Sequence, residues 1–116
     1  MKNRDFQTIY KKGKSYVNKY LVMYVLENNN EENRLGISVS KKVGNSVIRH
    51  RITRLIRESY RLQRERFKNG YDIVIVARTN VREKTYKEIE SALLHLGKLH
   101  NIIDDLSENT NWKEYL

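Results

Sequence analysis

Hydrophobic residues recur along this chain with two spacings, one typical of helices and one typical of strands. In residues 3–12, Phe6, Ile9 and Tyr10 share a face at i, i+3, i+4 spacing, which predicts a short amphipathic helix. Its first residue, an asparagine, can cap the helix, and Gly13 can end it in a left-handed conformation. A helix this short is unstable alone in water, so we expect it to dock on the rest of the domain.

Two alternating stretches predict strands. Residues 16–27 predict a strand with an aromatic face on one side and an aliphatic face on the other, and residues 14–27 form either one strand or two. The polar run at 28–33 predicts a turn that closes a hairpin with a strand over 34–41. In this second strand, aliphatic and small residues alternate: Leu35, Ile37 and Val39 with Gly36, Ser38 and Ser40. The small residues leave one face shallow, which suits either close packing of a helix or the floor of a groove.

A long basic helix is predicted from about Val47 to Lys68, after an N-cap at Asn45 or Ser46. On a helical wheel its apolar side chains gather in one arc: Ile48, Ile52, Leu55, Ile56 and Leu62. Basic side chains gather in a narrower arc opposite: His50, Arg54, Arg57, Arg61 and Arg64. Arg51 lies to one side of this stripe, and Arg49 lies beyond its other edge. An ordinary solvated helix face mixes both signs of charge, so a stripe of one sign favours a phosphate-binding helix.

The remaining elements complete an α+β domain. An unbroken apolar run at Ile73–Ala77 predicts a strand over 71–78 that is buried on both faces. The passage from strand to helix to strand favours a parallel crossover between 34–41 and 71–78. Thr85 and Glu88 form a capping box for a final helix. The apolar stripe of that helix is Tyr86, Ile89, Leu93, Leu96, Leu99 and Ile103. The order is therefore αβββαβα or αββαβα, a two-layer sandwich with helices on one face of a small sheet.

Length and charge narrow the class of protein. The 116 residues suffice for one domain, which we place at 1–103, followed by an acidic, flexible tail at 104–116. There are 23 Lys and Arg against 14 Asp and Glu, and residues 34–68 alone hold 11 basic and two acidic side chains. Such a localised field indicates nucleic acid as the partner. An anionic membrane is the competing partner, but the apolar face of the basic helix is needed for the core.

Segments that direct a chain to membranes or out of the cell are not visible. No run is long enough to span a membrane, and the start MKNRDF lacks the apolar part of a signal peptide. Cysteine is absent, which excludes disulfides and thiolate metal sites and fits the cytoplasm. We therefore expect a cytoplasmic protein that has no membrane partner.

Candidate catalytic groups do not converge in the sequence. His95 and His100 stand five residues apart on a helix and so do not share a face, and His50 lies among arginines that would repel a metal. The serines of the second strand have no nearby histidine to act as a base. Gly13-Lys14-Ser15 lacks the upstream glycine of a phosphate-binding loop. We expect no catalytic residue, metal site or cofactor in the protein alone.

Residues 38–58 carry a specific motif. They read SVSKKVGNSV over 38–47 and RHRITRLIRE over 49–58. This block resembles the protein subunit of bacterial ribonuclease P, in which S-V-S-K-K-x-G-N-[AS]-V precedes R-N-R-x-[KR]-R-x-x-R-[EQ]. The resemblance covers roughly residues 2–100. Two departures stand out, since His50 replaces the usual Asn and Thr53 replaces a usual Lys or Arg. A neutral imidazole can still bond RNA and gains charge at lower pH, whereas the threonine removes at most one phosphate contact.

The resemblance implies both a fold and a function. The fold is the ribosomal-protein-S5-domain-2-like α+β sandwich with a left-handed β-α-β crossover, opposite to the general rule. The function is to assist a catalytic RNA that removes the 5′ leader from precursor tRNA. In that enzyme the protein is a non-catalytic subunit that binds the RNA and the single-stranded leader, and Mg²⁺ is required through the RNA. DNA is not an expected partner.

The same resemblance assigns residues to two RNA contacts. Those that would face the catalytic RNA are Lys41, Lys42, Asn45, Arg49, His50, Arg51, Arg54, Arg57 and Arg61. Those that would line the leader groove are Phe6, Tyr10, Ser15, Tyr24, Ser38 and Ser40. For Phe6, packing in the core is the alternative. Two other classes compete with this function: a ribosomal or other basic-helix nucleic-acid-binding assembly protein without a role in tRNA processing, and an enzyme that works alone.

Overall fold

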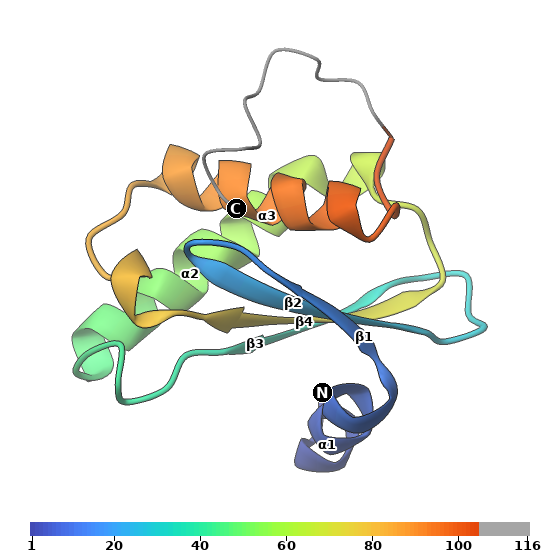
Figure 1. The fold of residues 1–116 in the computed structure, drawn as a ribbon, viewed down its shortest axis with the longest axis horizontal. Helices are drawn as coiled ribbons and strands as arrows, with labels where there is room; N and C mark the ends of the chain where they lie inside the picture. Colours follow the sequence, from blue (N-terminus) through green and yellow to red (C-terminus); the bar gives the residue numbers. More distant parts are fainter. Residues whose placement is uncertain (105–116) are drawn as a thin grey trace.

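The computed structural model describes residues 1–104, arranged as a sheet with helices on both sides (Figure 1). The main elements are α1 (Asn3–Lys12), β1 (Lys14–Val17), β2 (Leu21–Glu27), β3 (Arg34–Ser38), α2 (Ser46–Gln63), β4 (Tyr71–Ala77) and α3 (Tyr86–Leu99). Two 3₁₀ helices, η1 (Arg64–Arg66) and η2 (Thr79–Val81), follow α2 and β4. All of the predicted tail except Asp104 lies outside the described residues.

The sheet has four strands in the order β1-β2-β4-β3. β1 and β2 are antiparallel, as are β2 and β4, whereas β3 and β4 are parallel. The predicted crossover is confirmed, because the chain leaves β3, forms α2 and returns beside β3 as β4. The predicted hairpin between residues 16–27 and 34–41 is wrong, because β4 lies between β2 and β3. β4 takes the central place because it is apolar on both faces.

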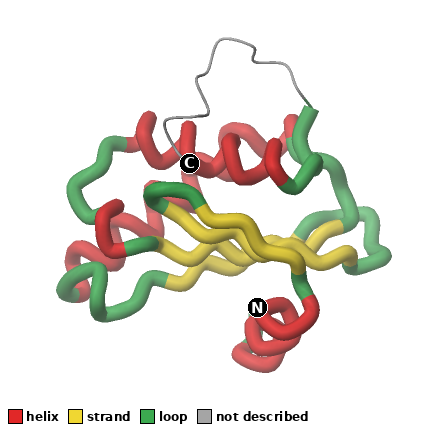
Figure 2. Tube along the Cα trace, in the orientation of Figure 1, coloured by secondary structure: helices red, strands yellow, loops and turns green. Residues whose placement is uncertain are grey.

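α2 and α3 cover one face of the sheet and bury the main core there (Figures 1 and 2). Inward side chains line up across the strands, with Met23 opposite Ile75 and Val25 opposite Ile73. The helices add fully buried side chains to this layer: Ile52 and Ile56 from α2, and Ile89, Leu93 and Leu96 from α3. Apart from Leu62 at the end of α2, the apolar stripes expected from the spacing thus face this core. No helix within residues 1–104 is long and apolar enough to cross a membrane.

α1 lies on the opposite face of the sheet from α2 and α3 (Figure 2). The predicted α+β sandwich is confirmed, but the expectation that all helices lie on one face of the sheet is wrong, because the apolar face of α1 docks on the other face through Ile9. The bounds of α1 match the prediction, but both of its ends differ from it. Lys2 rather than Asn3 is the N-cap, and Gly13 has a φ of −75°, so the helix ends in extended rather than left-handed backbone. The extended residue leads the chain directly into β1.

The first predicted strand forms two, β1 and β2, because the chain turns at Asn18. The buried Asn18 side chain accepts the backbone N–H groups of Tyr20 and Leu21 through Oδ1, at 3.1 and 3.0 Å. Its nitrogen Nδ2 donates to the carbonyl oxygen of Ala92 at 2.9 Å and lies 3.1 Å from Nδ1 of His95. One side chain therefore closes the hairpin and ties it to α3.

α2 ends at Gln63, earlier than predicted. Leu62, which the wheel places in the apolar arc, is 55 % exposed. The core beneath this turn is filled instead by Tyr60 and Phe67, whose ring centroids are 5.0 Å apart. Ile103 lies past the end of α3 and pairs through its backbone with Phe67.

Candidate nucleic-acid interface

The outer side of α2 is the first candidate surface, and a tight turn fixes where this helix begins. Val43 is buried beneath the turn that carries the exposed Lys41 and Lys42. Asn45 caps the helix, since its side-chain oxygen accepts the N–H of Ile48 at 3.0 Å. The buried valine and the cap together set the direction in which the basic side chains of α2 point.

Four predicted basic side chains of α2 are exposed on its outer side: His50, Arg54, Arg57 and Arg61. Arg54 and Arg57 form no hydrogen bond or ion pair with any other residue in 1–104. Arg61 donates from Nε to Oε2 of Glu58 at 3.0 Å, and this bond holds the pKa of the Glu58 carboxyl below its usual range. The stripe thus points outward as predicted, with one guanidinium partly neutralised.

Arg51 has a different role from its neighbours. Its Nη1 donates to the carbonyl oxygen of Arg82 at 3.2 Å, and its Nη2 donates to that of Lys84 at 3.0 Å. The side chain, although exposed, therefore ties α2 to the segment between η2 and α3. These bonds occupy only part of the five N–H groups of a guanidinium, so the rest stay available for a phosphate.

Arg49 and Thr53 are half-buried in α2. Nε of Arg49 is buried without a hydrogen-bond partner among the described residues. The Thr53 hydroxyl donates to the carbonyl oxygen of Arg49 at 2.8 Å. The position at which the ribonuclease P motif has a cation is therefore occupied by a hydroxyl that bonds its own helix.

The second candidate surface lies on the sheet face that carries α1, where three aromatic rings form a row. The ring centroids of Phe6 and Tyr10 are 6.2 Å apart, and those of Tyr10 and Tyr24 are 4.9 Å apart. Phe6 is half-buried and rests on Gly36, where an added Cβ would lie 2.7 Å from the ring. Tyr10 is 38 % exposed. Phe6 is therefore partly packed, as its alternative interpretation expects, while the row as a whole reaches solvent.

The predicted serines extend this face beside the aromatic row. Ser15 is opposite Tyr24 in the β1–β2 register. Ser38 is two residues after Gly36 in β3, so both point to the same side of the sheet. Ser40 lies past the end of β3, where its hydroxyl oxygen accepts a backbone N–H of the turn at 3.3 Å. The structure thus gathers five of the six predicted leader residues on one face and places Ser40 at its end.

Three valines that the sequence analysis did not assign form an aliphatic part of this face. Val22 is opposite Val17 on one side and Val76 on the other. Val17 is 51 % exposed, and the other two are partly exposed. The alternation of Val22 with Tyr24 could have identified the first of them, whereas Val17 required the hairpin.

An ion-pair cluster holds α1 against the sheet. Arg34 in β3 donates from Nε and Nη2 to the two carboxylate oxygens of Asp72, at 2.8 and 2.6 Å. Its Nη1 lies 3.6 Å from Oδ2 of Asp5 in α1. Asn28 also donates to Asp72, at 3.0 Å. The bonds from Arg34 in particular hold the pKa of the buried Asp72 carboxyl below its usual range.

The two histidines of the final helix region have separate structural partners. His95 contacts Asn18, and Nε2 of His100 lies 2.9 Å from the carbonyl oxygen of Met23. Burial lowers the pKa of both imidazoles. Among residues 1–104, no three His, Asp or Glu side chains come together in a way that could hold a metal ion.

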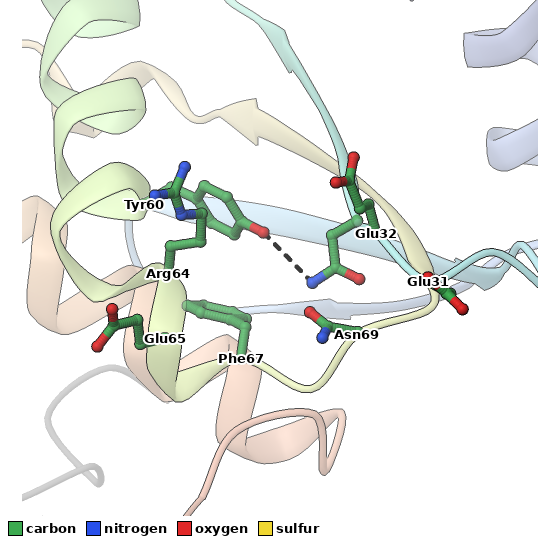
Figure 3. Close-up of a pocket in the computed structure, with 8 residues that line it drawn as sticks. Glu31, Glu32, Tyr60, Arg64, Glu65, Phe67 and Asn69 are labelled. Carbon is green, nitrogen blue, oxygen red and sulfur yellow. Dashed lines mark hydrogen bonds between the residues drawn. The ribbon is translucent and has the colours of Figure 1, made fainter.

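A pocket of about 700 Å³ opens at the C-terminal end of α2 (Figure 3). Tyr60 and Phe67 form its aromatic wall, and Nδ2 of Asn33 donates to the Tyr60 hydroxyl at 3.3 Å. Its charged side chains are three carboxylates and one guanidinium: Glu31, Glu32, Glu65 and Arg64. The excess of carboxylates would repel phosphate, so this pocket is not part of the candidate interface.

Comparisons with known proteins identify the fold and the family. The family described as Ribonuclease P matches residues 1–100. The ribonuclease P protein component of Lachnoclostridium phytofermentans is 61 % identical over 109 residues, covering 94 % of each chain. That of Alkaliphilus metalliredigens is 59 % identical over 102 residues, covering 88 % of this chain and 92 % of the relative.

Solved structures of RNase P proteins are also similar to this chain. The Staphylococcus aureus RNase P protein matches with a TM-score of 0.82 at 40 % identity, covering 90 % of this chain and 95 % of that one. The Thermotoga maritima RNase P protein matches with a TM-score of 0.77 at 32 % identity, covering 82 % and 91 %.

Fold and surfaces together define the class: a small basic α+β protein of the RNase P protein fold. The family predicted from residues 38–58 is confirmed. The chain belongs to the ribonuclease P protein family and is a protein component of that tRNA-processing ribonucleoprotein.

Proposed function

We propose that the protein assists the catalytic RNA of ribonuclease P in removing the 5′ leader from precursor tRNA, using two surfaces. The RNA-subunit surface is the outer side of α2 with its preceding turn, and it binds the catalytic RNA. The leader groove is the row of Phe6, Tyr10 and Tyr24 with the adjoining sheet face, and it binds the single-stranded leader. The observation that carries the proposal is the outward row of guanidiniums on α2, two of which, Arg54 and Arg57, form no ion pair within residues 1–104.

Like charges on the RNA-subunit surface repel one another, and a polyanion relieves that repulsion. A structured RNA hides its base edges in a deep groove and is read by shape and phosphates. Guanidinium groups suit this task, because they present several N–H donors in one plane. The proposed contacts on this surface are Lys41, Lys42, Asn45, Arg49, His50, Arg51, Arg54, Arg57 and Arg61.

Leaders of varied sequence require contacts that tolerate any base. Stacking on aromatic side chains meets this need, at about 1–3 kcal/mol per base. Tyr10 and Tyr24 offer ring area near the open part of the sheet, and the row of valines offers an apolar floor beside them. The proposed contacts are Phe6, Tyr10, Ser15, Tyr24, Ser38 and Ser40.

The hydrolysis itself is proposed to take place on the RNA, with Mg²⁺ held through the RNA. The protein then contributes binding energy and no catalytic side chain. Its two surfaces would place the leader beside the catalytic RNA and tighten the binding of the precursor.

A processing assay tests this function directly. Precursor tRNA is incubated with the catalytic RNA, with the protein, and with both, and the affinity of the complex for precursor and mature tRNA is measured in parallel. We expect cleavage to be most efficient with both components, no cleavage by the protein alone, and tighter binding of the precursor. Equal affinity for precursor and mature tRNA would contradict the leader groove. Processing that is unaffected by the protein would favour an assembly protein with another role.

A further inference from the structure

A second group of cations continues the basic surface beyond α2. Residues 78–87, which run from the end of β4 through η2 into the first turn of α3, hold four basic side chains and one acidic one: Arg78, Arg82, Lys84, Lys87 and Glu83. Figure 1 shows this segment beside the N-terminal turns of α2. It lies outside the motif at 38–58 and holds none of the residues that were predicted to contact RNA.

Arg51 joins this 78–87 segment to α2. Its bonds to the carbonyl oxygens of Arg82 and Lys84 hold the backbone of the segment against the helix. The side chain of Arg82 remains exposed, and that of Lys84 is partly exposed. The exposed cations of the two elements therefore belong to neighbouring parts of the molecule that are joined by hydrogen bonds.

Positive charge is also concentrated where the β1–β2 turn meets the 78–87 segment. The ammonium groups of Lys19 and Lys84 lie 5.8 and 5.2 Å from the centroid of the Tyr20 ring. Glu88 lies 3.8 Å from Lys84 and offsets only part of this charge. Arg82 has no ion pair with another described residue, and neither has Lys87. As on α2, carboxylates therefore offset only part of the positive charge of this segment.

A shallow groove of about 480 Å³ runs along the side of α2 that carries Arg51. Its lining residues are Val47, His50, Arg51, Arg54, Leu55 and Glu58. Val47 is 75 % exposed, so the groove has an apolar part among its cations. The groove is lined by α2 alone, and one of its lining residues, Arg51, also reaches the 78–87 segment. A sugar–phosphate backbone has the charge and the apolar edge that fit such a groove on α2, and Arg51 leads from it to the second basic element.

We propose that the 78–87 segment, together with Lys19, is a second phosphate-binding wall for the catalytic RNA, beside α2. This inference rests on the proposed function of the RNA-subunit surface. The occupant is the catalytic RNA rather than the leader, because the segment leads into α3 on the face of the sheet opposite to α1 and its aromatic row.

The test removes two charges from this wall and two from elsewhere. Arg82→Gln with Lys87→Gln is compared with Arg4→Gln and Lys11→Gln, two exposed cations of α1 on the other face of the sheet. The affinity of each full-length double variant for the catalytic RNA is measured over a series of salt concentrations. We expect the first pair to lower the affinity roughly ten-fold at about 0.1 M salt. The slope of log affinity against log salt concentration should also become smaller in magnitude by about one to two. The control pair should change neither quantity.

The possible results distinguish a failure of the second wall from a failure of the proposed RNA-subunit surface on α2. Arg54→Ala with Arg57→Ala is measured in the same series, and thermal unfolding verifies that every variant is folded. A lower slope for the α2 pair with a native slope for the 78–87 pair would overturn the second wall alone. Native slopes for both pairs would overturn the RNA-subunit surface as well. A 78–87 pair that weakens only the binding of precursor tRNA would assign the segment to the substrate and also overturn the inference.

Discussion

Asn18 shows how one amide sets the protonation of a neighbouring ring. Its Oδ1 accepts the backbone N–H groups of Tyr20 and Leu21, so its Nδ2 must be the atom that faces His95. Nδ2 can only donate, and Nδ1 of His95 is therefore an acceptor without a proton. Protonation of Nδ1 would set two donors against each other in a buried place. Burial also lowers the pKa of this imidazole.

Lowering the pH from about 7 to about 5 should reduce the free energy of unfolding. Burial lowers the pKa values of His95 and His100 in the folded state below the ordinary value of 6.5. The unfolded state then binds more protons in the window below 6.5, so stability falls as the pH falls through it. Urea unfolding at several pH values measures the effect. His95→Gln should flatten part of the profile.

Gly36 gives a second prediction at the scale of one residue. A Cβ at this position would lie 2.7 Å from Cζ of Phe6 and 2.8 Å from the sulfur of Met1, so Gly36→Ala must displace the ring. We expect weaker binding of precursor tRNA by the complex, roughly two- to ten-fold if one stacking contact is impaired. Affinity for mature tRNA and for the catalytic RNA should not change. Equal losses for precursor and mature tRNA would show that Phe6 does not act through the leader.

At the scale of elements, hydrophobic spacing was sufficient to predict most of the helices and strands. It was not sufficient to predict which strands lie next to each other in the sheet. The periodicities placed α1 and β4 nearly at their observed ends, and they placed the start of α3 but not its end, because Ile103 was assigned to a helix that stops at Leu99. The hairpin across residues 28–33 was wrong because adjacency along the chain was taken as adjacency in the sheet. The unbroken apolar run of β4 already indicated a central strand. A central β4 is not compatible with direct pairing of β2 and β3, so the hairpin prediction could have been rejected from the sequence.

The candidate site was predictable to a similar extent. The outward direction of Arg54 and Arg57 followed from the helical wheel, because the opposite arc had to face the core. The bonds of Arg51 did not, because its acceptors are backbone carbonyls of residues 82 and 84, and their position depends on how a distant segment packs. The half-burial of Arg49 likewise depends on neighbours in space that a helical wheel does not contain.

Replacing Arg51 and Arg54 by alanine, one at a time, should have different effects on stability and on RNA binding. Arg51→Ala removes two hydrogen bonds to the 82–84 backbone and should lower the free energy of unfolding by about 1 kcal/mol. Arg54→Ala removes no internal bond and should leave stability unchanged while lowering the salt slope of RNA binding by about one. Thermal or urea unfolding and RNA titrations on both variants measure the difference. Equal effects of the two substitutions on stability would contradict the bracing role of Arg51.

At the scale of the whole molecule, the two proposed RNA surfaces lie on opposite layers that share one sheet. Arg34 links the layers, since it bonds Asp72 in the central strand β4 and lies beside Asp5 in α1. A change at this cluster should therefore affect the leader groove and the stability of the fold, and leave the RNA-subunit surface intact.

Arg34→Ala tests this link. The buried Asp72 carboxylate would keep only the bond from Asn28, and we expect a loss of about 2 kcal/mol in the free energy of unfolding at neutral pH. The pKa of Asp72 is lowered in the folded protein, so this stabilisation is present above the unfolded carboxyl pKa and disappears as the pH falls through the folded value. The difference between native and variant protein should therefore shrink in acid. Arg4→Ala, on the exposed side of α1, is the control.

The attachment of α1 has a consequence for motion. Ile9 is the one buried side chain that this helix contributes, and the helix makes no part of the layer between the sheet and α2 and α3. The free energy needed to lift α1 from the sheet is therefore smaller than that of global unfolding. Backbone amides of α1 should exchange with deuterated solvent sooner than those of α2. A bound leader, by holding Phe6 and Tyr10 in place, would slow that exchange, so leader recognition would be recorded in the lifetimes of these amides.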